Sequence, residues 1–222
     1  MEGFDVLVKP FFIDGPHPAL YAHLFHLLYH PFAFAYDLVA ATVSFGRWND
    51  WTKEVIPFVK GTRILEIGHG PGHLQRSLLD LDLDPVAIDA SAQMGILAKR
   101  KLGTKHKLTR GLAQQLPFTS DCFDSVVSTF PTEYIFNART LSEIGRCLSD
   151  GGRLIVMPAA WPKSGFLKWL YKITGESPAD GQTSIVLRIS QPFITAGFET
   201  RIDTVELQSV KLMIIVAHKK RI

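Results

Sequence analysis

Two carboxylates, one on each side of a glycine-rich turn, are the residues of this chain whose types and spacing could do chemistry. Glu66 lies in a short apolar run, and three glycines follow it at alternate positions, Gly68, Gly70 and Gly72. Glycine adopts backbone conformations that a Cβ forbids, and it lets a ligand approach the main chain closely. An acid directly before such a turn suits a ligand that carries an amino group better than one that carries a phosphate.

The second carboxylate, Asp89, ends another apolar run about one strand–helix–strand step after Gly68. A carboxylate at the carboxyl end of a parallel strand can accept hydrogen bonds from both hydroxyls of a ribose. We therefore expect Glu66 and Asp89 to bind opposite ends of a nucleoside that carries an amino acid.

Two other nucleotide-binding motifs fail on spacing. The dinucleotide pattern G-x-G-x-x-G, counted from Gly68, requires a third glycine at the position of His73. The phosphate loop G-x-x-x-x-G-K-[ST] fails as well, because no Gly-Lys pair follows at the required distance. These mismatches disfavour a nicotinamide cofactor and a nucleoside triphosphate.

The elements that must position these residues are a strand before the turn and a helix after it. Residues 63 to 67 are short and mostly apolar, as in a buried parallel strand. Pro71 favours the first turn of a helix, in which Leu74, Leu78 and Leu79 would face inward.

The segment from Leu65 to Gly72, together with residues 88 to 91, resembles the class I S-adenosylmethionine-dependent methyltransferases. It is most similar to the branch of the quinone-ring C-methyltransferases and the bacterial phospholipid N-methyltransferases (methyltransferase type 11-like), over residues 36 to 160. The resemblance implies an α/β fold: a doubly wound, Rossmann-like seven-stranded sheet with an antiparallel C-terminal hairpin. It divides the chain into an aromatic helical N-terminal lid, residues 1–60, and one compact catalytic domain, residues 61–222.

The resemblance also implies the cofactor, S-adenosyl-L-methionine, and the residues that bind it. Residues 111 to 118 resemble the family segment G-D-A-x-x-L-P-F, but Leu112 stands where an acid would read the adenine amino group. That contact would come from Gln114 or from a main-chain carbonyl. Met94, on a helix that Ser91 would cap, either packs on adenine or only on the sheet. The expected cofactor-binding set is Tyr36, Glu66, Gly68, His69, Gly70, Gly72, Asp89, Ala90, Met94, Ala113, Gln114 and Thr129.

The reacting methyl group should lie beyond the fourth strand, which we expect over residues 123 to 128, because open α/β sheets bind ligands at the carboxyl ends of their strands. The next residues, 129 to 132, do not match the Asn/Asp-Pro-Pro-aromatic tetrad of N-methyltransferases that act on nucleic acid or protein. A carbon or oxygen nucleophile would use a base, and the candidates are His17, Glu133 and Tyr134. A neutral amine would need none.

The remaining segments complete the expected fold. We expect a third strand over residues 106–109, a helix over 137–148 ended by Gly151 and Gly152, and a fifth strand over 153–157. A last helix over 184–196 precedes two antiparallel strands, 199–206 and 210–217. Residues 48 to 59 read as one helix whose tryptophans pack on the core.

The apolar stretch of residues 19 to 45 and the aromatic, lysine-bearing stretch of residues 161 to 172 raise the question of a membrane. Histidines, Asp37 and Pro31 interrupt the first stretch, so we expect no transmembrane segment there. The second suits a helix on a membrane surface, a substrate cap, or buried packing with lysines reaching outward. His23, His26 and His30 share one helical face, but we expect a solvated stripe and no metal.

Composition narrows the function classes further. The chain has 222 residues, 46% of them hydrophobic, and a formal net charge of +3, without the concentrated basic face that a nucleic-acid partner requires. Cys122 and Cys147 form no metal or redox spacing, and the first residues lack a secretory apolar region. We expect a cytoplasmic protein, with peripheral membrane contact as an open alternative.

The sequence thus predicts a methyltransferase that moves a methyl group in line from S-adenosyl-L-methionine to a small, apolar acceptor, either quinone-like or a lipid amine. The alternative is a protein that binds S-adenosylmethionine or S-adenosylhomocysteine without transferring methyl groups, for which the Leu112 departure is the sequence support.

Overall fold

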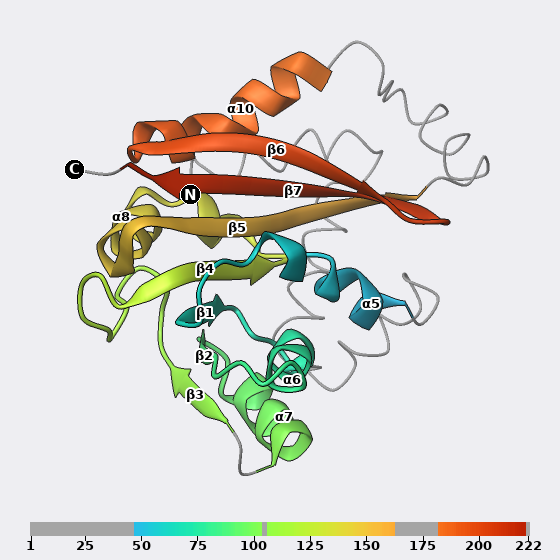
Figure 1. Ribbon diagram of the computed structural model, residues 1–222, viewed down its shortest axis with the longest axis vertical. Coiled ribbons are helices and arrows are strands. Elements are labelled where there is room, and N and C mark those ends of the chain that lie inside the picture. The colour runs from blue at the N-terminus through green and yellow to red at the C-terminus, as the bar shows by residue number, and fades with distance from the viewer. Residues whose placement is uncertain (1–46, 104–105, 163–181, 221–222) are drawn as a thin grey trace, which may run out of the picture.

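The computed structural model describes residues 47–103, 106–162 and 182–220, of which residues 161–162 and 182–187 are placed by backbone alone (Figure 1). The described residues do not include His17, Tyr36, the histidine stripe or residues 163 to 172, so the roles predicted for them fall outside the structure described. Most of the expected lid, residues 1–46, lies outside them as well.

One seven-stranded sheet runs through the molecule in the order β3-β2-β1-β4-β5-β7-β6. Strands β1 to β5 are parallel to their neighbours among themselves, and β7 is antiparallel to both β5 and β6. The doubly wound sheet with an antiparallel C-terminal hairpin is therefore confirmed. The strands are β1 Ile64–Ile67, β2 Val86–Asp89, β3 Lys107–Arg110, β4 Phe123–Thr129, β5 Leu148–Pro162, β6 Phe198–Glu206 and β7 Val210–Lys219.

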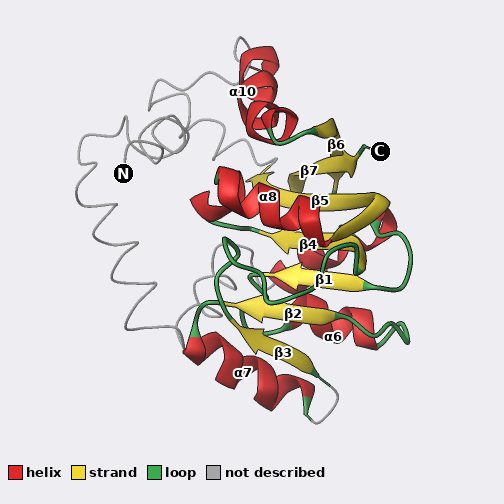
Figure 2. Ribbon diagram, turned by 90° about the vertical axis from the view of Figure 1, so that its left-hand side faces the viewer, coloured by secondary structure: helices red, strands yellow, loops and turns green. Residues whose placement is uncertain are grey.

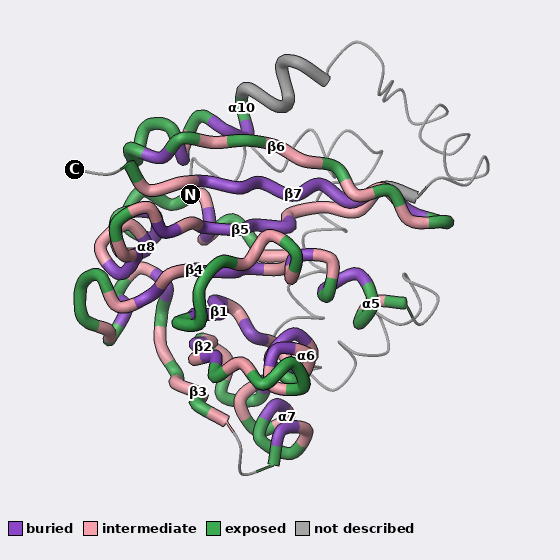
Figure 3. Tube along the Cα trace, in the orientation of Figure 1, coloured by how far each residue is buried: buried purple, intermediate pink, exposed green. Residues whose placement is uncertain are grey.

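Helices cover both faces of the sheet, and Figure 2 shows α6 and α8 on opposite sides of it. One apolar core packs α8 and α10 against the sheet, and a second packs α5 and α6 against the other face. Strands β1, β4 and β7 are buried along most of their length, whereas the edge strands β3 and β6 consist mostly of half-buried and exposed residues (Figure 3). The helices are α5 Trp48–Lys53, α6 His73–Leu79, α7 Ala92–Leu102, α8 Ala138–Cys147 and α10 Gln182–Thr195, with short 3-10 turns η1 Ile56–Phe58 and η2 Glu133–Phe136.

The alternation of side chains in β1 decides where the first carboxylate points. Leu65 and Ile67 belong to the core beneath α8, and Ile64 belongs to the core beneath α5 and α6. Because successive side chains of a strand point to opposite faces, Glu66 lies on the same face as Ile64. It therefore faces α6, the helix that follows the glycine turn.

Two predicted boundaries are wrong. Residues 48 to 59 do not form one helix, because Pro57 lacks the N–H of a continuing helix and disfavours helical geometry at the residue before it. The fifth strand begins at Leu148, not at residue 153: the pairing with β4 slips between Phe123 and Ser125, so that the glycine pair lies in an irregular part of the strand. Elsewhere the expected strands and helices are found within a few residues.

None of the helices in the described ranges has both the length and the apolar character needed to cross a membrane.

Candidate cofactor site

The sheet reverses its winding between β1 and β4, with β2 and β3 on one side and β5 on the other. In open α/β sheets, ligands bind beyond the carboxyl ends of the strands at such a reversal. The glycine turn follows β1 there, and Asp89 ends β2. The structure thus brings the two predicted anchors to one edge of the sheet.

The glycine turn has the backbone geometry that its sequence predicts. Gly68, Gly70 and Gly72 have φ values of 75°, 52° and 84°, in the left-handed region that residues with a Cβ avoid. At Gly68 a Cβ would also lie 2.4 Å from the Tyr134 hydroxyl. At Gly70 nothing would lie within 4 Å of a Cβ, so that part of the turn is open to a ligand.

Asp89 connects the glycine turn to β2. One carboxylate oxygen accepts a hydrogen bond from the Gly70 N–H at 2.9 Å, and the other accepts one from the Ser91 N–H at 2.8 Å. The side chain is half-buried. These bonds fix the orientation of the carboxylate, and each oxygen keeps a lone pair for a further donor, such as a ribose hydroxyl.

Glu66 is a buried acid without a full set of partners. It is 1% exposed, and its Oε2 accepts no hydrogen bond from the described residues. Burial raises its pKa to about 8, with a smaller contribution from Asp89. The neighbouring Gln75 opposes this increase only in part, and neither polar atom of its carboxamide makes a hydrogen bond of ordinary geometry within the described residues. An ammonium group beside Glu66 would satisfy the orphaned oxygen.

His69 lies in the turn but points inward. It is 4% exposed, and its Nδ1, 2.7 Å from the Gly70 carbonyl oxygen, donates a hydrogen bond to it. Burial lowers its pKa, an effect that Asp89 opposes, so the imidazole is neutral near pH 7. The part of His69 that could touch a ligand is therefore its main chain.

On the expected adenine side, Met94 is 8% exposed and lies one turn after the Ser91 cap, whose hydroxyl accepts the Met94 N–H. Ala113 is buried, Gln114 is half-buried and Ala90 is exposed. Leu112 is 58% exposed, so it holds no place in the core.

On the expected methyl side, Thr129 ends β4 and is half-buried, and Glu133 is exposed at the start of η2. Tyr134 lies against the glycine turn. Its hydroxyl is 3.0 Å from the Ser128 hydroxyl and donates to the Ile67 carbonyl oxygen at 3.3 Å. Tyr134 therefore joins the segment after β4 to the turn after β1, and its hydroxyl is engaged by protein groups.

The sequence reading missed Ser128 and Gln75. Ser128 is buried and donates to the Ile67 carbonyl oxygen at 2.8 Å, and Gln75 is completely buried next to Glu66. The signal for Gln75 was its place beside Leu74, on the inward face of the predicted helix. For Ser128 there was no such signal, because in the sequence it is only a short polar residue that follows two valines of the predicted strand.

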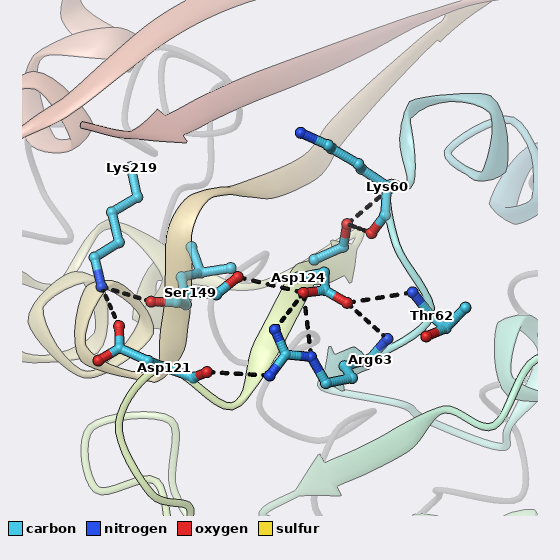
Figure 4. Close-up of polar contacts among 9 residues, drawn as sticks. Lys60, Thr62, Arg63, Asp121, Asp124, Ser149 and Lys219 are labelled. Carbon is cyan, nitrogen blue, oxygen red and sulfur yellow. Dashed lines mark hydrogen bonds and ion pairs between the residues drawn. The ribbon is translucent and has the colours of Figure 1, made fainter. Parts of the chain in front are cut away.

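The opposite edge of the sheet holds the polar contacts of Asp121 and Asp124, which Figure 4 shows. Arg63 pairs with Asp124 at 2.5 Å, which lowers the pKa of Asp124 to about 2, and Lys219 pairs with Asp121 at 2.7 Å. A depression of about 430 Å³ there is lined by four cationic side chains, from Lys60, Arg153, Lys219 and Lys220, together with His218 and the acid Glu199. It lies at the amino ends of the parallel strands, away from the glycine turn.

Comparisons with known proteins agree with this geometry. Residues 65–156 match the model of a methyltransferase domain. The chain is 31% identical over 156 residues to a demethylmenaquinone methyltransferase from Symbiobacterium thermophilum, an alignment that covers 64% of this chain and 61% of that protein. The chain thus spans about three fifths of the length of this relative.

Solved structures share the fold at low identity. A protein from Thermotoga maritima, described as an S-adenosylmethionine-dependent methyltransferase and possible histamine N-methyltransferase, aligns with a TM-score of 0.59 and 20% identity. That alignment covers 89% of this chain and 100% of the other. The [4+2]-cyclase SpnF aligns with a TM-score of 0.54 and 18% identity, over 79% of this chain and 81% of its own. At these identities the likeness concerns the fold alone.

Proposed function

Because the chain carries a class I S-adenosylmethionine-dependent methyltransferase domain similar to the quinone C-methyltransferases, we propose that it transfers a methyl group from S-adenosyl-L-methionine to a small, apolar acceptor. The observation that carries the proposal is the meeting of Glu66, the glycine turn and Asp89 at one edge of the sheet.

The described residues fit this cofactor. The orphaned carboxyl oxygen of Glu66 would take the amino group, and the Asp89 carboxylate, held by two main-chain donors, would take the ribose hydroxyls. The open backbone at Gly70 would let the cofactor lie along the turn. Met94, Ala113 and Gln114 would surround the adenine. The main chain of Gly68, His69, Gly72 and Ala90, together with Tyr36 and Thr129, completes the proposed set.

When bound, the cofactor supplies an electrophilic methyl group on a sulfonium. The protein then has to hold the nucleophile in line with that methyl group and exclude water, and such positioning can contribute on the order of 7 to 11 kcal/mol. Ser128, near the end of β4, and Tyr134, after it, serve this end because both donate hydrogen bonds to the carbonyl oxygen of Ile67, the last residue of β1 before the glycine turn. The lid, residues 1–60, is proposed to close over the same edge.

A base is required only for a carbon or oxygen nucleophile. His17, Glu133 and Tyr134 remain the proposed candidates. Among them, Glu133 is exposed in η2, whereas the Tyr134 hydroxyl already bonds to Ser128 and to the Ile67 carbonyl oxygen. These contacts favour Glu133 over Tyr134 as a proton acceptor within the described residues.

The acceptor we propose is a quinone-like ring, with a lipid amine as the other member of the class. The name of the Symbiobacterium thermophilum relative supports the ring. An acceptor of either kind partitions into lipid, so a peripheral contact with a membrane surface is part of the proposal.

A second candidate function is binding of S-adenosylmethionine or S-adenosylhomocysteine without methyl transfer. The fold also serves a [4+2]-cyclase, SpnF, so the fold by itself does not establish methyl transfer. The exposed Leu112, in place of an acid, favours a site that has lost part of its adenine recognition.

The two functions are separated by incubating the whole chain with methyl-labelled S-adenosylmethionine and a total lipid extract. Label in the organic phase supports the transferase, whereas tight cofactor binding without transfer across a broad acceptor panel supports the binding protein. S-adenosylhomocysteine, and not NAD, should raise the unfolding temperature, by the mass action of a ligand that binds only the folded state.

A further inference from the structure

Cys122 and Cys147 are the two cysteines of the chain, and both are free thiols. They are far apart in the sequence, since Cys122 lies just before β4 and Cys147 ends α8. The main chain nevertheless joins the residues that precede them, because the Asp121 N–H donates a hydrogen bond to the Arg146 carbonyl oxygen at 3.0 Å. The fold thus brings together two thiols that their spacing in the sequence does not connect.

The residues that follow the two cysteines are joined as well. Phe123 is the partner of Leu148 where β4 and β5 begin side by side in parallel. Neighbouring strands lie about 5 Å apart, and a disulfide requires Cα atoms that are roughly 4.4 to 6.8 Å apart. A main-chain link on each side of Cys122 and Cys147 therefore keeps their Cα atoms near the separation that a disulfide requires.

The two sulfur atoms also lie beneath the same turn of the loop before β4. The Cys122 thiol donates to the Thr119 carbonyl oxygen at 2.9 Å, and the Cys147 sulfur is 4.0 Å from the carbonyl oxygen of Phe118. Burial raises the pKa of Cys147 to about 11, Arg146 opposes the increase, and Cys122 adds to it, in part through a hydrogen bond between the two thiols. The two thiols are therefore in contact.

The two thiols differ in their access to solvent. Cys122 is half-buried, whereas Cys147 is completely buried. An oxidant that arrives from solvent therefore meets Cys122 first. Cys147 keeps its proton near pH 7 and lies within the core, so it can react only with a sulfur that is already oxidised and already next to it.

We propose that Cys122 and Cys147 are a modification site, at which a hydroperoxide produces a disulfide that small thiols reduce again. In the first step the Cys122 sulfur attacks a peroxide oxygen: the S–O bond forms, the O–O bond breaks, and the thiol proton leaves with the alcohol or water. In the second step the Cys147 sulfur attacks the Cys122 sulfur: the S–S bond forms, the S–O bond breaks, and the Cys147 proton leaves with the hydroxyl group as water. The two thiols together lose two electrons, which reduce the peroxide.

The disulfide would fasten the loop between β3 and β4 to α8. Arg146 already donates to two carbonyl oxygens of this loop, at 2.8 and 3.1 Å, and Glu143 accepts the Leu116 N–H at 2.9 Å. The same loop carries Ala113 and Gln114, which are expected beside the adenine. A covalent link at its end would therefore restrain the adenine side of the fold. Disulfide formation requires neither the cofactor nor methyl transfer, so the site does not depend on the proposed function.

Treating the reduced whole chain with a small excess of hydrogen peroxide tests this site. We expect the intact mass to fall by two hydrogen atoms, and the tryptic peptides that contain Cys122 and Cys147 to stay linked. The unfolding temperature should rise by roughly 10 °C, because a disulfide that closes a loop of this length constrains the unfolded chain. Dithiothreitol should reverse all three changes.

Two variants serve as controls. Cys122→Ser keeps a hydroxyl that can donate to the Thr119 carbonyl oxygen but removes the thiol that meets the oxidant. The double variant Cys147→Ala with Ser142→Cys keeps two thiols but moves one of them to an exposed position on α8. Neither variant should form an internal link, and neither should gain unfolding temperature on oxidation. Cooperative thermal unfolding of each reduced variant shows that it folds.

Linked peptides in the oxidised wild type, and in neither control, would support the site. A wild type whose thiols both stay free, or whose Cys122 is oxidised to the sulfinic acid without a link, would overturn it. Disulfide-linked dimers without the internal link would overturn it too, as would an internal link in the double variant that forms as readily as in wild type. An internal disulfide that leaves the unfolding temperature unchanged or lower would overturn the fastening of the loop.

Discussion

Replacing Glu66 by glutamine tests whether the buried acid is maintained for a ligand. In the protein without cofactor its pKa is raised to about 8 by burial, against an ordinary value of 4.5. Below pH 4.5 the carboxyl is protonated in the folded and unfolded states alike, so it adds nothing to the pH dependence. Between pH 4.5 and 8 the unfolded chain releases the proton that the folded protein keeps.

The free energy of unfolding should therefore fall as the pH rises through this window, by at most about 1.4 kcal/mol per pH unit. Summed over the window, the loss in the free energy of unfolding has an upper bound of about 5 kcal/mol. Glutamine carries no charge at any pH, so Glu66→Gln should flatten the curve and be the more stable protein at pH 8. Urea unfolding at half-unit steps from pH 5 to pH 9 measures both curves.

Folding without cofactor favours the protonated form of Glu66, whereas cofactor binding should favour its charged form. The amino group of S-adenosylhomocysteine favours the carboxylate, so binding near pH 6.5 should release about one proton, seen as a binding enthalpy that depends on the buffer. Glu66→Gln should release none and should bind more weakly, by about tenfold to a hundredfold, as expected for the loss of a charged hydrogen bond.

The control is Glu54→Gln, in the turn after α5, which should follow the wild-type curve and bind normally. Equal pH slopes for wild type and Glu66→Gln, together with equal affinity for S-adenosylhomocysteine, would refute the role given to this acid.

Three further predictions concern the cofactor edge of the sheet and the polar network at its opposite edge. Asp89→Ala removes the acceptor of two main-chain N–H groups and should raise the Kd for S-adenosylhomocysteine at least tenfold by calorimetry, and an unchanged Kd would contradict the ribose assignment. Gly68→Ala should lower both the unfolding temperature and the affinity, because its Cβ would meet the Tyr134 hydroxyl at 2.4 Å; adding Tyr134→Phe should restore part of the loss, and no restoration would mean that backbone strain alone is responsible. The Arg63 pair lowers the pKa of Asp124 to about 2, so the stability that the pair adds is lost as the pH falls from about 4 to about 2. Asp124→Asn should therefore reduce the loss of unfolding free energy between pH 4 and pH 2. A loss identical to that of wild type would show that the pair contributes nothing.

Much of the fold was predictable because each strand of the cofactor half has a local signature. The apolar run before the glycines gives β1, and the run that ends in Asp89 gives β2. Glycine at three alternate positions is explained by three left-handed backbone conformations, so the turn could be predicted without a structure.

The rest depends on contacts between distant residues. Nothing in the residues around Phe130 shows that its ring meets Trp48, or that its backbone is left-handed. Gln75 follows a leucine on a predicted inward face, but only the packing of α6 on β1 buries it next to Glu66. The start of β5 was missed because a glycine pair usually ends an element, whereas here the slip in pairing keeps the strand continuous.

The unequal lengths of the strands divide the sheet into two mechanical halves. Strands β1, β2 and β3 have four residues each, whereas β5, β6 and β7 have 15, 9 and 10. Short ladders open at lower free energy than long ones, so amide protons of β2 and β3 should exchange with deuterium earliest in the ligand-free protein. The half that is proposed to bind the nucleoside is thus the one that opens more easily. Cofactor binding should slow hydrogen exchange in β2 and leave the exchange rate of the long hairpin, β6 and β7, unchanged.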